Sequence, residues 1–81
     1  MLVKCTVRDG FIPSQKFATI ATIDGTEQVA VSGSLLENDY LRVSTPLGRE
    51  PGKYLVELPV ESANGNWRVW INEDQVRETA S

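Results

Sequence analysis

The stretch KYLVELPVESANGNWRVWI, from Lys53 to Ile71, has two runs of alternating apolar residues on either side of Asn64-Gly65. Asn-Gly is the pair that best tolerates the positive φ angles of a two-residue type I′ turn. The stretch therefore predicts a β-hairpin with Asn64 and Gly65 as its loop. In this register Glu61 faces Arg68, so two opposite charges meet across the ladder.

Side chains of a strand alternate between two faces, so the register sorts the hairpin into an apolar face and a mixed face. The apolar face, expected in the core, holds Val56, Leu58, Val60, Trp67, Val69 and Ile71. The mixed face, expected outside, holds Glu57, Pro59, Glu61, Arg68 and Trp70. Pro59 faces Trp70 in this register. Because proline cannot donate to a ladder, it predicts an edge strand or a bulge.

Length and composition indicate one folded domain spanning residues 1–81, with 41% hydrophobic and 23% charged residues. No apolar run approaches the roughly 20 residues of a membrane span, and the N-terminus lacks the apolar block of a signal peptide. We therefore expect a cytoplasmic protein without a membrane partner. The single cysteine, Cys5, cannot form an internal disulfide and is expected to be buried.

The net charge of −3 argues against general affinity for nucleic acids, which depends on neutralising phosphates. The charge is uneven, because Lys4, Arg8 and Lys16 stand against Asp9 in the first 16 residues.

The rest of the chain reads as short strands separated by turns. Residues 2–8 alternate as a half-buried strand, and Asp24-Gly25 predicts a second hairpin between residues 17–23 and 26–32. One face of that hairpin is expected to hold Ala18, Ile20, Val29 and Val31. At most one helical turn fits at residues 35–39, a short turn is expected at 72–75, and residues 76–79 can form a last strand. No internal repeat is apparent.

Five or six short strands predict an all-β fold, either a small SH3-like barrel or a two-sheet antiparallel sandwich with one short 3₁₀ or helical turn. The hairpin at 53–71 followed by a turn at 72–76 resembles the SH3-like barrels in architecture. The aromatic pair in an acidic loop near the N-terminus of peptide-binding SH3 domains is missing, and Phe11 is the one candidate there. An OB-like barrel is the alternative topology.

The sequence predicts a protein that is not an enzyme and uses no cofactor or metal. It has no histidine, the commonest general base and metal ligand, and no nucleophile or phosphate-binding motif. The carboxylate pairs Glu73-Asp74 and Glu57/Glu61 fall in a predicted cap and on an open sheet face, where both groups are expected to be solvated.

Two binding functions are compatible with these residues. The first is a protein-interaction module or small accessory subunit that binds another protein, or itself, through an exposed tryptophan beside an arginine. Its expected residues are Trp70, Arg68, Pro59, Glu57, Glu61 and Tyr54. Trp70 could instead cover its own sheet or lie under the loop at residues 46–51. The second function is a nucleic-acid-binding β-barrel that uses Lys4, Arg8 and Lys16, with Phe11 as a stacking group.

Overall fold

The computed structural model describes residues 1–78, and the prediction of an all-β fold is confirmed there. The elements in chain order are β1 (Leu2–Lys4), β2 (Thr6–Asp9), β3 (Gln15–Thr22), β4 (Gly25–Ser32), η1 (Gly33–Leu35), β5 (Leu36–Glu37), β6 (Tyr40–Arg42), β7 (Gly48–Glu50), β8 (Lys53–Glu57), β9 (Arg68–Asn72), η2 (Glu73–Gln75) and β10 (Val76–Arg77). Both η elements are single 3₁₀ turns. The last strand was expected to reach Thr79, which lies outside the described residues.

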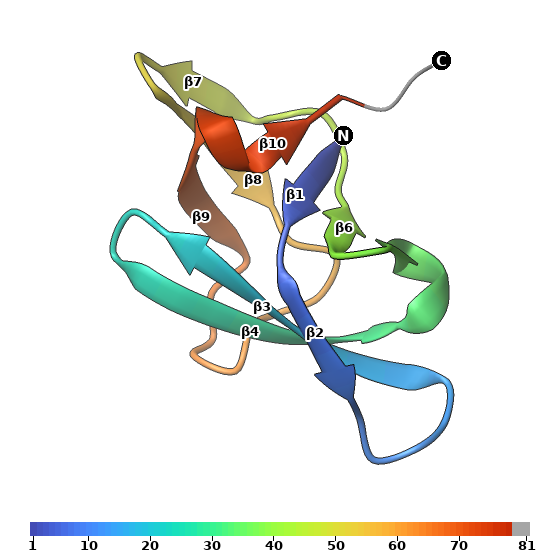
Figure 1. Ribbon diagram of the computed structural model, residues 1–81. Coiled ribbons are helices and arrows are strands. Elements are labelled where there is room, and N and C mark those ends of the chain that lie inside the picture. Colours follow the sequence, from blue (N-terminus) through green and yellow to red (C-terminus); the bar gives the residue numbers. More distant parts are fainter. Residues whose placement is uncertain (79–81) are drawn as a thin grey trace.

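The described strands form three antiparallel sheets, in the orders β10-β1-β6-β5, β2-β3-β4 and β7-β8-β9. They do not close into one hydrogen-bonded barrel (Figure 1). One apolar core is shared by all three sheets, and it includes Val3, Ile20, Leu41, Val56 and Ile71.

The β3-β4 hairpin has the expected apolar face but a different register. Ala18, Ile20, Val29 and Val31 are all buried. The turn consists of Ile23-Asp24 instead of Asp24-Gly25, and Thr22 faces Gly25. Gly25 has a φ of +146°, which is accessible to a residue without a Cβ. The pairing is thereby shifted by two residues, and the buried face is unchanged.

The predicted register of the β8-β9 hairpin is wrong by four residues. Arg68 faces Glu57 instead of Glu61, and Trp70 faces Leu55 instead of Pro59. Because four is an even number, each side chain keeps its expected face. Val56, Leu58, Val69 and Ile71 are accordingly buried.

The cause of this shift lies in the connection between the two strands. The Asn64-Gly65 turn is not type I′, because Gly65 has a positive φ of +83° whereas Asn64 does not. The turn is closed by Ser62, whose N–H donates to the carbonyl of Asn66 over 2.9 Å. Residues 59–61 then lie outside the ladder, where proline had predicted an edge or a bulge.

Trp67 was expected in the core and is instead 52% exposed. It precedes β9, and its Nε1–H donates to Glu61 Oε2 over 3.0 Å. The alternation of the strand is preserved, but the core ends at Val69, so the indole lies beyond its edge.

The sheets also contain an internal two-fold repeat that the sequence did not reveal. The N–H of Cys5 donates to the carbonyl of Asp39, and the N–H of Val43 donates to the carbonyl of Met1. A shift of 38 residues turns the first bond into the second. Each half ends in a strand, a 3₁₀ turn and a short strand, as β4-η1-β5 and as β9-η2-β10. The pairing of β1 with β6 joins the two halves at the centre.

Candidate protein-binding surface

The outer face of the β7-β8-β9 sheet carries a row of three residues centred on Leu55. Gly48 faces Leu55 from β7, and Trp70 faces Leu55 from β9. A Cβ built on Gly48 would lie 3.5 Å from Leu55 Cβ and 3.8 Å from Trp70 Cη2. The glycine therefore leaves room for the indole to lie across β8 toward β7. Both Leu55 and Trp70 remain partly exposed.

Charged pairs border this row on both sides. Lys53 Nζ lies 5.1 Å from the centre of the Trp70 ring and 3.2 Å from Glu50 Oε1. On the other side Arg68 Nε lies 3.6 Å from Glu57 Oε2. A cation over an indole is favourable, although both ion pairs are solvated and each contributes at most about 1 kcal/mol. The row with these four charged residues is called the Trp70 face below.

The structure brings together only part of the predicted partner-binding set. Trp70, Arg68 and Glu57 share the Trp70 face. Pro59 and Glu61 lie in the connection after β8, and Glu61 contacts Trp67 instead. Tyr54 packs against the core, with Arg49 5.3 Å from its ring centre. The sequence prediction missed Leu55, Lys53 and Gly48, whose place depends on the correct register.

A hollow of about 160 Å³ adjoins the Trp70 face. Trp70, Val69 and Arg68 line it from β9, and Asp24 and Glu27 line it from the β3-β4 hairpin. A single hydrogen bond, from Ile23 N–H to the carbonyl of Trp70, joins that hairpin to β9 here over 2.9 Å. The hollow therefore lies between two hairpins that come from different halves of the chain.

Glu27, buried at one wall of this hollow, holds the turn between β8 and β9. Its carboxylate accepts hydrogen bonds from Ser62 Oγ at 2.6 Å, Asn66 Nδ2 at 3.0 Å and Asn64 Nδ2 at 3.3 Å. The Ser62 hydrogen bond, helped by those of the two asparagines, lowers the pKa of Glu27 against the opposing effect of burial. Glu27 is thus ionised at neutral pH and fully engaged as an anchor.

We expect Glu27→Gln to lower the free energy of unfolding by about 1–2 kcal/mol at pH 7, because a charge-assisted acceptor is lost. Since the pKa of Glu27 is lower in the folded state, its contribution is present above the unfolded pKa and is lost as pH falls through the folded pKa. Urea denaturation of both proteins between pH 7 and pH 3 should show the difference shrinking toward acid pH. A difference that grows toward acid pH would contradict the assignment.

The residues predicted for nucleic acid are only partly brought together. Arg8 lies 5.3 Å from the centre of the Phe17 ring, and Phe11 packs edge-on against the same ring at 5.4 Å. Lys16 is tied to Asp9 by a 2.7 Å ion pair, so its charge is offset. Lys4 lies on β1, in a different sheet. Arg8 and Phe11 form a small cluster without a continuous basic track.

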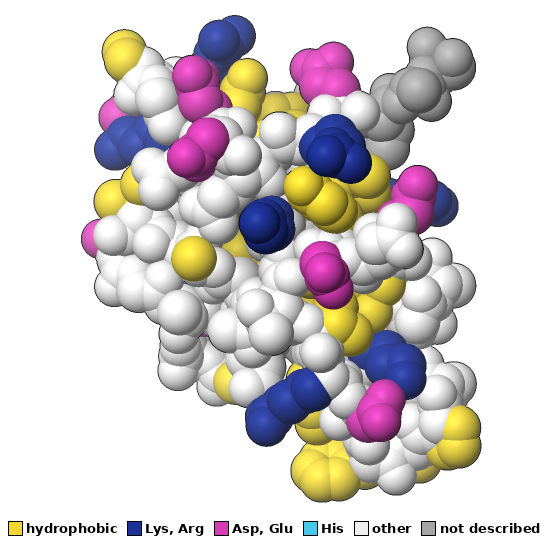
Figure 2. All heavy atoms as spheres, in the orientation of Figure 1, with side chains coloured by type: hydrophobic (Ala, Val, Ile, Leu, Met, Phe, Trp, Pro, Cys, Tyr) yellow, Lys and Arg dark blue, Asp and Glu magenta, His cyan; other side chains and the backbone are white. Residues whose placement is uncertain are grey.

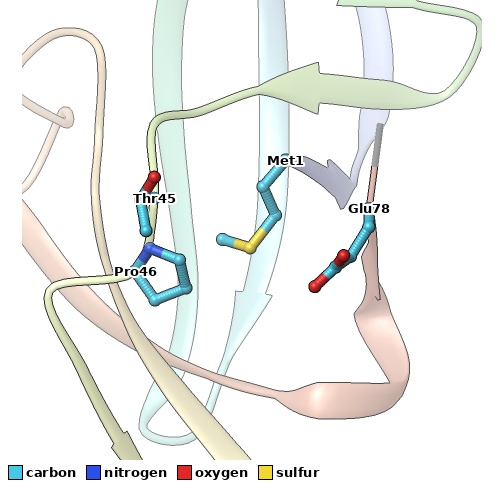
Figure 3. A pocket seen from close by; sticks show the side chains of 4 residues that line it. All are labelled: Met1, Thr45, Pro46 and Glu78. Atoms are coloured by element: carbon cyan, nitrogen blue, oxygen red, sulfur yellow. The ribbon is translucent and has the colours of Figure 1, made fainter. Parts of the chain in front are cut away.

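A second hollow, of about 200 Å³, lies beside the N-terminus and is lined by Met1, Thr45, Pro46 and Glu78. Figure 3 shows the Met1 side chain extending between Pro46 and Glu78. The Met1 ammonium donates to the carbonyl of Val43 over 3.2 Å. With one carboxylate as its charged side chain, this hollow has no arrangement of groups that indicates a reaction.

The reactive side chains that the structure describes are not assembled into a catalytic or metal site. Burial, with a smaller contribution from Asp39, raises the pKa of the Cys5 thiol to about 11, so it stays protonated and unreactive. No group of three or more potential metal-ligating side chains occurs among residues 1–78. None of the helical turns in that part of the chain is long and apolar enough to cross a membrane.

Comparison of the chain with family models, curated proteins and solved structures found no match. The functional argument therefore depends on the geometry described above.

Proposed function

We propose that this protein is a non-catalytic interaction module, or a small accessory subunit, that binds a protein partner through the Trp70 face. The observation that carries the proposal is the partly exposed indole, which lies over Gly48 beside Leu55. Binding hot spots are enriched in tryptophan and arginine and are surrounded by contacts that exclude water. The two ion pairs that border the row are suited to such a rim.

Several features favour binding over catalysis. The sequence has no histidine, and the buried carboxylate of Glu27 is fully engaged in holding a turn. The raised pKa of Cys5 removes the one thiol as a nucleophile. A single reduced cysteine also suits the reducing cytoplasm, which we propose as the location of the protein.

The likeness to SH3-like barrels is part of the same proposal. It is supported by the tight strand pairing of β8 with β9 and by the 3₁₀ turn that leads from β9 into the short strand β10. The OB-like alternative would place a helix between strands at residues 35–39, where the structure has β5 and a turn.

Quantitative affinity capture with two tryptophan variants tests this function. Wild type, Trp70→Ala and Trp67→Ala are immobilised, and bound proteins from a native lysate are compared by mass spectrometry. Trp67 is the matched control, because it is also exposed but lies outside the Trp70 face. A partner retained by wild type and Trp67→Ala and lost with Trp70→Ala supports the proposal. The same partners on all three proteins would exclude the Trp70 face.

Nucleic-acid binding is the second candidate, and the clustering of Arg8 and Phe11 around Phe17 is the observation that favours it. Its support is weaker because the Lys16 charge is offset by Asp9. The two functions respond differently to salt, since affinity for nucleic acid falls steeply with ionic strength whereas docking of an apolar face changes little.

A further inference from the structure

The tip of the β2-β3 hairpin exposes apolar side chains on a rigid turn. Phe11 is 89% exposed and Ile12 is 58% exposed. The turn is held by hydrogen bonds from Gly10 N–H to Gln15 O at 3.0 Å, from Gln15 N–H to Ile12 O at 3.0 Å and from Phe11 N–H to Gln15 Oε1 at 2.9 Å. An apolar group that is already fixed in place loses little conformational entropy when it binds. The tip is therefore preorganised for docking.

The space-filling view shows the same feature at the surface. In Figure 1 the β2-β3 hairpin projects at the bottom of the molecule, and in Figure 2 hydrophobic and basic side chains gather at that end. Arg8 and Lys16 lie behind the tip, and Asp9 offsets one of these charges. The tip thus combines a projecting aromatic ring with a net positive charge.

The hollow beside Trp70 matches this tip in size and in charge. Its volume of about 160 Å³ is close to the roughly 150 Å³ of a cavity that holds one benzene ring. Val69 and Trp70 offer apolar walls, and Arg68 offers a cation for an aromatic ring. Asp24 and Glu27 outweigh Arg68, so the hollow carries a net negative charge opposite in sign to the tip.

The tip cannot reach the hollow of its own chain. β3 runs from Gln15, beside the tip, to Thr22, beside the hollow. Seven steps along a strand span roughly 23 Å. Because the two features lie at opposite ends of one extended strand, any contact between them joins two molecules.

We propose that the partner of the Trp70 face is a second copy of this chain, whose Phe11 ring enters the hollow beside Trp70. This inference rests on the proposed function and assigns the occupant of that face. The surfaces on the two molecules differ, so the contact is heterologous, and contacts of this type form open head-to-tail chains unless the rotation closes a ring.

Sedimentation velocity over a range of protein concentrations tests the inference with one variant for each surface. Phe11→Ser removes the ring, and Asp24→Arg reverses the charge at the hollow on an exposed turn residue. Wild type is expected to form dimers and longer species as concentration rises. Each variant alone is expected to associate at least tenfold more weakly, with an unchanged circular dichroism spectrum.

Mixing the two variants gives the decisive result. The Asp24→Arg chain retains an intact tip and the Phe11→Ser chain retains an intact hollow, so an equimolar mixture is expected to form dimers that grow no further. A wild type that stays monomeric, or a Phe11→Ser protein that associates like wild type, would overturn the inference. Should the wild type stay monomeric while Trp70→Ala still loses a captured partner, the proposed function stands with a different occupant. Loss of that partner also with Phe11→Ser would assign the tip to another protein.

Discussion

Replacing Ile71 by alanine is expected to lower the free energy of unfolding by about 2–5 kcal/mol. Ile71 is 0% exposed and is among the largest fully buried side chains of the described core. It belongs to β9, where it faces Tyr54 of β8 and packs with residues of the other two sheets. Truncation removes apolar contacts and leaves a cavity that a small core cannot fill. Urea denaturation followed by circular dichroism measures the loss.

The matched control for this substitution is Ile12→Ala, which makes the same chemical change at a residue that is 58% exposed. Surface substitutions usually change stability by no more than about 0.5 kcal/mol. Because small domains are stable by only about 5–15 kcal/mol, the two variants should be easy to distinguish. Equal losses at the two positions would mean that the core is placed wrongly.

Trp70→Ala is expected to weaken binding of the captured partner by about 30-fold or more, which is the loss of a 2 kcal/mol hot spot. The indole is only partly buried, and it contacts the outer face of its own sheet. Its removal should therefore cost about 1–2 kcal/mol of stability, less than Ile71→Ala. Titration calorimetry or surface plasmon resonance with the partner measures the affinity, and urea denaturation measures the stability.

The tryptophan pair separates a binding role from a structural one. Trp67→Ala, with its bond to Glu61 removed, should bind the partner like wild type. An unfolded Trp70→Ala protein would show that the indole is structural and would remove the basis for the Trp70 face.

The sequence predicted strand faces better than strand pairing. Alternation identified Val56, Leu58, Val69 and Ile71 as inward residues, because the period of a strand does not depend on its partner. Pairing depends on the turn, and Asn-Gly also suits a turn in which glycine alone takes the positive φ. The deciding contacts come from Glu27, which is more than 30 residues away and binds Ser62 and Asn66.

The residues around Trp70 could be predicted only in part for the same reason. Arg68 and Glu57 share its face in either register, whereas Leu55 replaces Pro59 opposite the indole only in the observed one. Gly48 and the hollow come from segments whose approach is a tertiary event with no local signal.

The internal repeat escaped sequence reasoning because its halves share burial and pairing more than residue identity. The 38-residue shift relates Cys5 to Val43 and Lys4 to Arg42, one buried pair and one exposed pair. Both pairs suit the same positions on β1, β6 and the residues that follow them. Conservation of such properties is visible in coordinates and faint in a single sequence.

The proton contacts of Trp70 test the placement of the Trp70 face most directly. Leu58 N–H donates to the carbonyl of Trp67, and bonded pairs alternate along the ladder, so Leu55 and Trp70 form a pair without mutual hydrogen bonds. The α protons of such a pair lie close together. The observed register predicts a strong nuclear Overhauser effect between the α protons of Trp70 and Leu55. A corresponding signal between Trp70 and Pro59 would restore the tight two-residue hairpin and contradict the surface on which the proposed function depends.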